Sequence, residues 1–313
     1  MLTKILKKRI ILTTAVLFAL SLMYILPKEK LYTLDKVEEE LVYEDENLNK
    51  EVVYLLDSNN MLGRTEVVIN RNDVISKARE LLEILINNDK SENKIPNGFR
   101  GLIPSDTKIN SLNFDNNVIK VDFSKELLDV DIKYEEKVVE AIVYTLTSIK
   151  DVDKVILYVD GEILTKLPKS GLNLPSTLDK SYGINKEYDL TTYKDVNQVT
   201  IYYVNKYNDQ TYYIPVTKYL NDDREKIKII IEELASSSSY SSNLMSYLNY
   251  NTKLLDYSLN ENEIDLNFNE YLFDNTENKK VLEEVIYSIS YSVKDNYDID
   301  VINFFVNNEK IKY

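Results

Sequence analysis

The 313-residue sequence contains no cysteine, no histidine and no tryptophan. Without cysteine there is no disulfide, no thiolate nucleophile and no lipid-modified cysteine of a lipoprotein. Without histidine as well, there is no His/Cys zinc site and no Ser-His-Asp triad. We therefore nominate no catalytic, metal-binding or cofactor-binding residue and expect a protein that is not an enzyme.

Negative charge outnumbers positive charge outside the first nine residues. The chain has 38 Lys and Arg against 52 Asp and Glu, for a net charge of −14. Lys4, Lys7, Lys8 and Arg9 lie at the N-terminus with no acid among them, so the remainder carries −14 − 4 = −18. A body this acidic is poorly suited to electrostatic binding of nucleic acid, and we expect no nucleic-acid partner.

An uncharged, mostly apolar run follows the basic end and extends from Ile10 through Leu17 to Leu26. Its length reaches the roughly 17–25 residues of a membrane-spanning helix, and the preceding cations predict a cytoplasmic N-terminus. We predict an uncleaved signal anchor, a single pass through the cell membrane and an extracytoplasmic body. A cleaved signal peptide, with a weak signal at Ala19-Leu20-Ser21, is the alternative.

Residues 107–123 and 252–268 carry the same β-hairpin pattern. In each, apolar residues alternate with polar ones along the second strand, and a cluster of Asn, Asp or Glu supplies the turn. Matched positions, such as Ile119 and Ile264, are 145 residues apart. A constant offset over a whole hairpin indicates that the chain is a duplication.

The hydrophobic pattern around each hairpin predicts the order strand, strand, helix, hairpin, helix, strand. The fold class is α+β: two tandem repeats, each ββαββαβ with its helices packed on a small mixed sheet, after one N-terminal transmembrane helix. The predicted parts are the anchor (1–27), a charged, glutamate-rich stalk (28–50), the first repeat (51–165), a linker of loop-forming residues (166–197) and the second repeat (198–313).

The first helix of each repeat is predicted to begin at an Asn-Asp cap, at residues 72–73 and 221–222. The second helices are predicted over residues 134–149 and 280–293. In this alignment Leu282 takes the place of Val138.

Four segments of the first repeat occur in a characteristic order: VYLLDSNN (53–60), GLIPSDTKI (101–109), VIKVDFSKEL (118–127) and VILYVDGEIL (155–164). Together they resemble the GerM family, the sporulation and spore germination domain, over about 50–165 and 198–313. The second repeat departs from the pattern, since Ser246 and Asn249 stand where Gly101 and Pro104 would be, so its assignment rests on the first.

The resemblance implies an extracytoplasmic protein of an endospore-forming bacterium that acts in spore formation or germination. It also implies a fold similar to the small α/β modules that build rings between the two membranes of a sporulating cell. No catalytic residues follow from it.

Three aspartates, Asp57, Asp122 and Asp160, could form a carboxylate cluster. Asp57 and Asp160 are predicted in strand-end turns, where Asp makes local hydrogen bonds, and Asp122 is predicted on the solvent side of its strand. Asparagine replaces each of them in the second repeat. The SxxK pattern at residues 91–94 lacks its companion motifs, and the serine run at 236–242 is predicted to be a loop tip. None of these is typical of a catalytic site.

Tyr203, Tyr207 and Tyr213 lie on neighbouring predicted strands of the second repeat. Tyrosine in a strand mostly packs within the sheet, but exposed tyrosine is enriched at binding surfaces. We designate these three residues as a candidate partner surface or sugar-stacking surface.

The preferred function is that of a non-enzymatic structural or assembly component of the envelope in spore formation or germination. Expected partners are other envelope or sporulation proteins, the membrane, and further copies of the chain through sheet edges. The alternative is a peptidoglycan-binding or glycan-binding envelope protein outside sporulation. An enzyme of the cell wall is disfavoured by the missing His and Cys.

Overall fold

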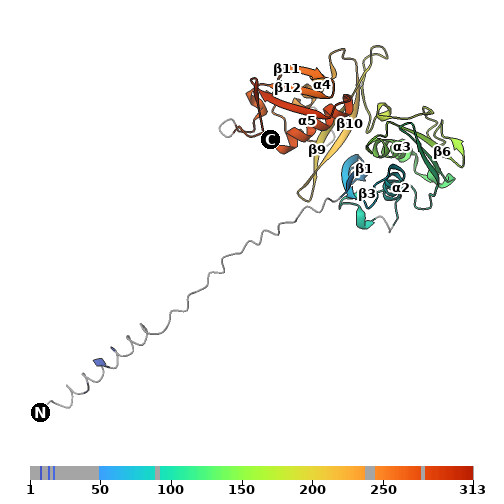
Figure 1. The fold of residues 1–313 in the computed structure, drawn as a ribbon, viewed down its shortest axis with the longest axis horizontal. Coiled ribbons are helices and arrows are strands. Elements are labelled where there is room, and N and C mark those ends of the chain that lie inside the picture. The colour runs from blue at the N-terminus through green and yellow to red at the C-terminus, as the bar shows by residue number, and fades with distance from the viewer. Residues whose placement is uncertain are drawn as a thin grey trace. The chain divides into compact units, whose positions relative to one another are not determined.

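A computed structural model of the chain describes residues 49–88, 92–236, 244–275 and 279–312, together with residues 8, 13, 14 and 17. The chain divides into two units, Met1–Asn47 and Leu48–Tyr313. The second unit contains both predicted repeats and all the labelled elements of Figure 1.

Both repeats follow the predicted order of elements, with four short strands in addition. The first contains β1 (Lys50–Asp57), β2 (Leu62–Val68), α2 (Val74–Leu85), β3 (Phe99–Arg100), β4 (Ile109–Asp115), β5 (Val118–Phe123), α3 (Ile132–Leu146), β6 (Lys154–Val159) and β7 (Glu162–Ile163). The second contains β9 (Asn197–Tyr207), β10 (Gln210–Leu220), α4 (Lys226–Ala235), β11 (Leu254–Asn260), β12 (Glu263–Phe268), α5 (Glu283–Asn296), β13 (Val301–Val306) and β14 (Glu309–Lys310). β8 (Glu187–Asp189) lies between them.

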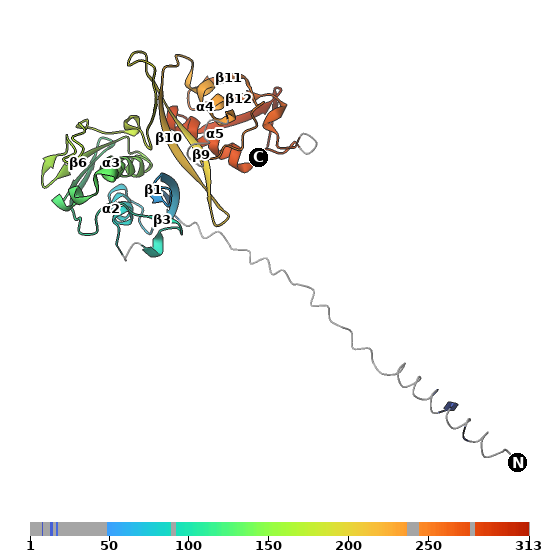
Figure 2. The same ribbon diagram turned by 180° about the vertical axis from the view of Figure 1, so that it is seen from behind.

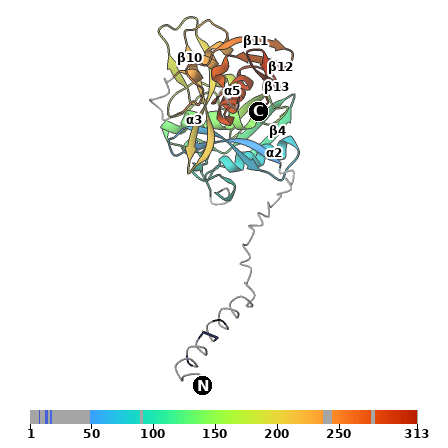
Figure 3. The same cartoon turned by 90° about the vertical axis from the view of Figure 1, so that its left-hand side faces the viewer.

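Each repeat builds one small mixed sheet, ordered β4-β5-β6-β7 in the first and β11-β12-β13-β14 in the second. The outer pairs are antiparallel and the central pair is parallel, because α3 or α5 carries the chain between the two central strands. Figure 3 shows β11, β12 and β13 in this order. Both predicted hairpins are present, and Asn116 and Asn117 turn the first with positive φ.

The opening strands differ from the prediction, which placed each pair in the sheet of its own repeat. They form one shared sheet, ordered β3-β1-β2-β10-β8, with β9 also paired to β10. Figures 1 and 2 show the long β9–β10 hairpin between the elements of the two repeats. Hydrophobic periodicity identifies a strand but does not reveal which strand pairs with its free edge, so this sheet could not be predicted.

Two hydrophobic cores fill the second unit. The first includes Val53, Leu81, Val121, Ile142 and Leu157, and the second includes Ile201, Ile230, Leu266, Ile289 and Phe304. The predicted linker also contributes to the first core through Leu167, Leu174, Leu178 and Ile184. This segment is therefore mostly loop, but it is packed against the first repeat.

The predicted helix caps are half correct. Asp73 caps α2 and accepts a hydrogen bond from the Ser76 N–H at 2.9 Å. In the second repeat the predicted cap is wrong, because α4 begins only after Glu225. The Asn221 side chain instead accepts a hydrogen bond from the Thr191 N–H at 2.8 Å and thus holds the linker.

The predicted match of the second helices is shifted by about one turn. The backbone N–H of Tyr54 donates to Thr145 Oγ1 on α3, and that of Tyr202 donates to Ser292 Oγ on α5. Thr145 and Ser292 are 147 positions apart, so Val285 rather than Leu282 takes the place of Val138. Apolar residues recur every three or four positions in a helix, so the pattern alone fits more than one alignment.

The predicted anchor lies almost wholly outside the described residues. Ile10 and Leu26 are not among them, and the Leu17 side chain is 65% exposed. Within the part of the chain that the structure describes, no helix has the length and apolar character needed to cross a membrane.

Gly101 lies where a loop meets the C-terminal end of α2, and replacing it tests this contact. A Cβ at Gly101 would approach the Leu85 carbonyl oxygen to 2.5 Å, so Gly101→Ala must displace backbone. We expect the free energy of unfolding, measured by urea denaturation, to fall by about 1–3 kcal/mol.

Gly161→Asn is the matched control. Gly161 has a φ of +83° with no atom within 4 Å of an added Cβ, and Asn308 occupies the equivalent turn with a φ of +68°. This variant should be close to neutral. Equal losses for both variants would contradict the proposed role of close backbone approach.

Candidate functional site

The two repeats meet where β2 pairs with β10. These are the second strands of the two opening hairpins, and they run antiparallel with one ladder pair, Arg64 opposite Tyr213. Because like strands meet in antiparallel orientation, the junction has approximate two-fold symmetry, as in a dimer of identical subunits.

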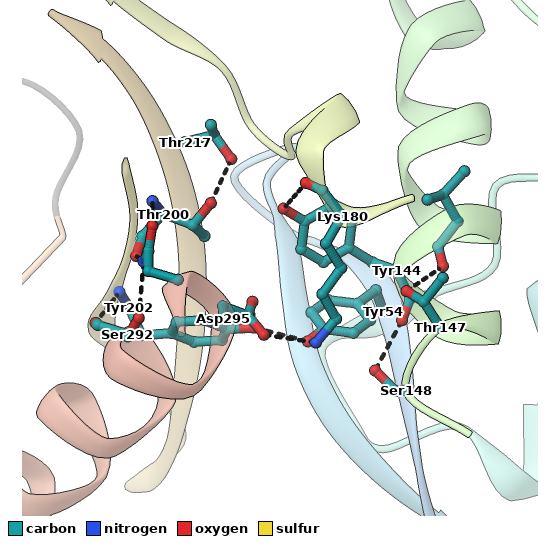
Figure 4. A network of polar contacts seen from close by, with 12 residues as sticks. Tyr54, Tyr144, Thr147, Ser148, Lys180, Thr200, Tyr202, Thr217, Ser292 and Asp295 are labelled. Carbon is teal, nitrogen blue, oxygen red and sulfur yellow. Dashed lines mark hydrogen bonds and ion pairs between the residues drawn. The ribbon is translucent and has the colours of Figure 1, made fainter. Parts of the chain in front are cut away.

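A buried polar network joins the repeats across this junction (Figure 4). The hydroxyls of Tyr54 and Tyr202 lie 2.7 Å apart, and the Tyr202 hydroxyl donates to Asp295 Oδ2 at 2.6 Å. Lys180 Nζ from the linker donates to the other Asp295 oxygen at 2.6 Å. The Asp295 carboxylate on α5 thus binds the linker and β9 directly, and it is connected to β1 through the Tyr202 hydroxyl.

Burial decides the protonation of this network. It raises the pKa of Tyr54 and of Tyr202, and the nearby Asp295 charge raises both further, so neither hydroxyl ionises near neutral pH. Burial also opposes the charge of Lys180, but the attraction of Asp295 and Tyr54 together outweighs it and the pKa of Lys180 is raised. The two repeats are thus joined through a buried ion pair and its hydrogen-bonded hydroxyls, and removing one partner would leave the others unpaired in the interior.

The helices α3 and α5 pack against β1 and β9 of the shared sheet. The N–H groups of Tyr54 and Tyr202 donate to Thr145 Oγ1 at 3.0 Å and to Ser292 Oγ at 2.8 Å. Hydroxyls on a helix therefore satisfy backbone donors that would otherwise be unpaired at a strand edge.

Asn185 of the linker fills a gap between β2 and β10. Its Nδ2 donates to the carbonyls of Leu62 at 2.9 Å and Pro215 at 2.8 Å, and its Oδ1 accepts from the Leu62 N–H at 3.0 Å. The Asn185 N–H donates to Glu140 Oε2 on α3 at 2.9 Å. Burial, opposed by the charges of Lys137 and Lys186, raises the pKa of Glu140 to about 7.

The three tyrosines nominated from the sequence do not share one exposed surface. Tyr203 is 2% exposed and belongs to the second core, so it cannot contact a partner. Tyr207 is half-buried against Gly98, and Tyr213 packs edge-on against Tyr291 with ring centres 5.2 Å apart. Sheet packing therefore accounts for most of this cluster.

Tyr207 and Tyr213 do line one cavity of about 260 Å³ at the junction, next to the one ladder pair of β2 and β10. The lining consists of Arg64, Thr65, Glu66, Pro96, Asn97, Phe99, Tyr207, Gln210, Thr211, Tyr212, Tyr213 and Tyr291. The Arg64 guanidinium lies 4.2 Å from the centre of the Tyr291 ring, which closes one side.

Two of the three aspartates considered as a carboxylate cluster, Asp57 and Asp122, accept hydrogen bonds that hold turns. Asp57 Oδ1 accepts from the N–H groups of Asn59 and Met61, and its Oδ2 accepts from the Tyr212 hydroxyl of the second repeat at 2.9 Å. Asp122 accepts from the Gly161 N–H at 3.0 Å. The Asp57 and Asp122 carboxylates therefore each hold a turn, as their asparagine counterparts can.

Two other sequence features fall partly outside the described residues. Ser91 of the SxxK pattern and residues 237–242 of the serine run are not among them. Across residues 49–88, 92–236, 244–275 and 279–312, no group of three or more Asp or Glu side chains is placed to hold a metal ion.

Sequence reasoning missed the residues that join the repeats, above all Lys180, Asn185 and Asp295. Their partners lie tens of positions away or more, up to 123 for the pair Leu62 and Asn185. No local pattern marks such residues. The one available signal was the leucine-bearing linker, which is too apolar for a solvated spacer.

Two copies of one ββαββαβ module that share a sheet define a tandem-domain protein held together by its own pseudosymmetric junction. The sequence pattern of the family described as Germane, sporulation and spore germination, matches residues 52–165 and 200–312. The chain belongs to this family, which confirms the resemblance found in the sequence.

A named relative and a solved structure agree with this assignment. The chain is 30% identical over 264 residues to the spore germination protein GerM of Bacillus subtilis (strain 168), which covers 82% of this chain and 70% of the relative. It matches the solved structure of the tandem GerMN domains of that sporulation protein with a TM-score of 0.76 and 28% identity, over 84% of this chain and 92% of the other. The homology supports a sporulation-related role and suggests a non-catalytic protein.

The Tyr202 hydroxyl is the element of the network that can be removed with least change of shape. In Tyr202→Phe, Asp295 and Tyr54 lose a buried partner, so the free energy of unfolding should fall by about 1–3 kcal/mol. Tyr193→Phe, at a tyrosine that is 95% exposed, is the control and should be neutral. Equal effects in urea denaturation would show that the network does not stabilise the junction.

Glu140 should make stability depend on pH. Its ordinary pKa is 4.5, and below that value the carboxyl is protonated in both the folded and the unfolded chain. As pH rises towards 7 the unfolded chain releases the proton first, so stability is lost, on the order of 3 kcal/mol by pH 8.

Glu140→Gln keeps the acceptor for Asn185 and cannot titrate, so it should flatten this part of the pH profile of unfolding free energy. Glu83→Gln, at an exposed glutamate on α2, should leave the profile unchanged. If the unfolding free energy of Glu140→Gln still falls by the full amount between pH 4.5 and 7, another group is responsible for the pH dependence.

Proposed function

We propose that the protein is a non-enzymatic, membrane-anchored component of the envelope in spore formation or germination, where it acts by assembly. The observation that carries this proposal is the β2–β10 junction. It indicates that this kind of domain associates with another of its own kind through strand edges.

Two further edges suit assembly with other subunits. β4 and β11 are the outer strands of the two small sheets. On β11, Leu255 is 53% exposed and Leu259 is 49% exposed, so this edge presents apolar side chains beside its backbone groups. An edge of this kind accepts a strand from a further copy or from another sporulation protein.

The apolar run at residues 10–26 supports the proposed anchor, with a cytoplasmic N-terminus and the two repeats outside the cytoplasm. The absence of cysteine means that this chain would be held by the apolar run and not by a lipid.

One observation favours the second candidate, a peptidoglycan-binding or glycan-binding envelope protein outside sporulation. Tyr188 on β8 and Tyr219 on β10 stack with ring centres 4.8 Å apart, and Tyr188 is 65% exposed. Exposed tyrosine is enriched at binding surfaces. Direct retention of a soluble fragment, residues 44–313, on purified peptidoglycan would favour this candidate.

A functional fluorescent fusion in the native host, followed in growing and in starved cells, tests the proposed function. We expect signal only during sporulation, at the membranes around the developing spore. The same fusion lacking residues 1–27 is the control and should lose membrane association.

Uniform envelope signal in growing cells would overturn the sporulation role and support the glycan-binding candidate. The assembly role has its own test, because a soluble fragment of residues 44–313 that stays monomeric at high concentration would count against self-association through β4 and β11.

A further inference from the structure

The edge of β10 that faces away from β9 is covered by the linker. The Thr217 N–H donates to the Ile184 carbonyl at 2.9 Å, and the Ile184 N–H donates to Thr217 Oγ1 at 2.9 Å. β8 then continues as a parallel strand beside Lys218–Leu220. The Ile184 side chain is fully buried, so the linker inserts one apolar residue and then adds a strand.

The duplication identifies the matching edge in the first repeat. Tyr54 and Tyr202 are equivalent, since both donate their N–H to a helix hydroxyl. They pair across their hairpins with Arg64 and Pro215, which are 151 positions apart. At the same offset, Glu66 is equivalent to Thr217.

By the same offset Val68 is equivalent to Tyr219, which pairs with β8. The Ile69 N–H donates to the Asn49 carbonyl on the β1 side, so the Val68 N–H points away from β1 to the outer edge. Among the strands that the structure describes, none pairs with Glu66 or Val68 on that side. Both residues are exposed, Val68 by 42%.

The cavity of about 260 Å³ opens at the start of this edge, beside Glu66 and Thr211. Five of its lining residues are aromatic. Its volume is below the roughly 300–1,000 Å³ typical of small-molecule sites, which favours a single side chain of a larger partner over a free ligand. Its lining includes Glu66, the equivalent of the Thr217 that binds Ile184 on β10.

We propose that this edge of β2 binds an extended segment of a partner polypeptide, which places an aliphatic side chain in the cavity and adds as a parallel strand at Glu66 and Val68. The surface continues the β2–β10 junction, and the covered edge of β10 shows the geometry of the occupant. The proposal concerns neither β4 nor β11 and stands whether or not the protein acts at the spore envelope.

The test uses residues 48–313, the unit that contains both cores, and a labelled peptide of residues 183–190 of this chain, GINKEYDL. Fluorescence anisotropy should show saturable binding. A peptide with aspartate in place of the isoleucine should bind more than tenfold more weakly, because the cavity is largely apolar. Val68→Pro removes the outward N–H and should weaken binding about tenfold, whereas Val68→Thr retains it and should not.

Hydrogen exchange of backbone amides identifies the strand edge that the peptide binds. This measurement does not depend on the Val68→Pro variant. Added peptide should slow exchange of the Val68 amide. Absence of saturable binding, equal affinity of the two peptides, or protection at Tyr219 in place of Val68 would overturn the proposal. A dimer of residues 48–313 that forms without peptide and is lost in Val68→Pro would show that a second copy occupies the edge, which also overturns it.

Discussion

The β2–β10 pairing is the contact on which the rest of the junction depends. It brings the two opening hairpins into one sheet, and only then do Tyr54 and Tyr202 reach each other. This pairing also forms the junction at which three polar groups make their hydrogen bonds: the Asp295 carboxylate, the Lys180 ammonium and the Asn185 amide. A single ladder pair is weak by itself, so the buried network supplies the strength and the strands supply the register.

The duplication and the junction together describe a symmetric association that has become asymmetric. The strands meet as in an isologous dimer. The connecting segment can occupy only one side of the symmetry axis, where Ile184 and β8 cover β10. On the helices the same divergence is visible: Glu140 of α3 holds Asn185, whereas Tyr287 at the equivalent position of α5 stacks on Tyr291.

The sequence predicted those parts of the fold that local chemistry determines. The hairpin turn at Asn116 and Asn117 and the cap at Asp73 follow from preferences within a few residues. The family could also be predicted from the sequence, because its motifs are local. The shared sheet and the role of Asp295 could not be predicted, since each depends on contacts over 90 residues or more and no alternation of apolar residues encodes them. The prediction that Tyr203 lies on a surface was wrong for a related reason. Its strand is buried on both faces, where tyrosine packs as a core residue.

The separation of Arg64 from Tyr213, 149 positions along the chain, has a consequence for synthesis. The first repeat leaves the ribosome long before β10 exists, so β2 waits with an open edge. Open edges pair with whatever strand is near, and the β10 of a neighbouring molecule has the right register. Crowded nascent chains should therefore exchange their second repeats, and the product would be a domain-swapped dimer in which the contacts of the junction are made between two molecules.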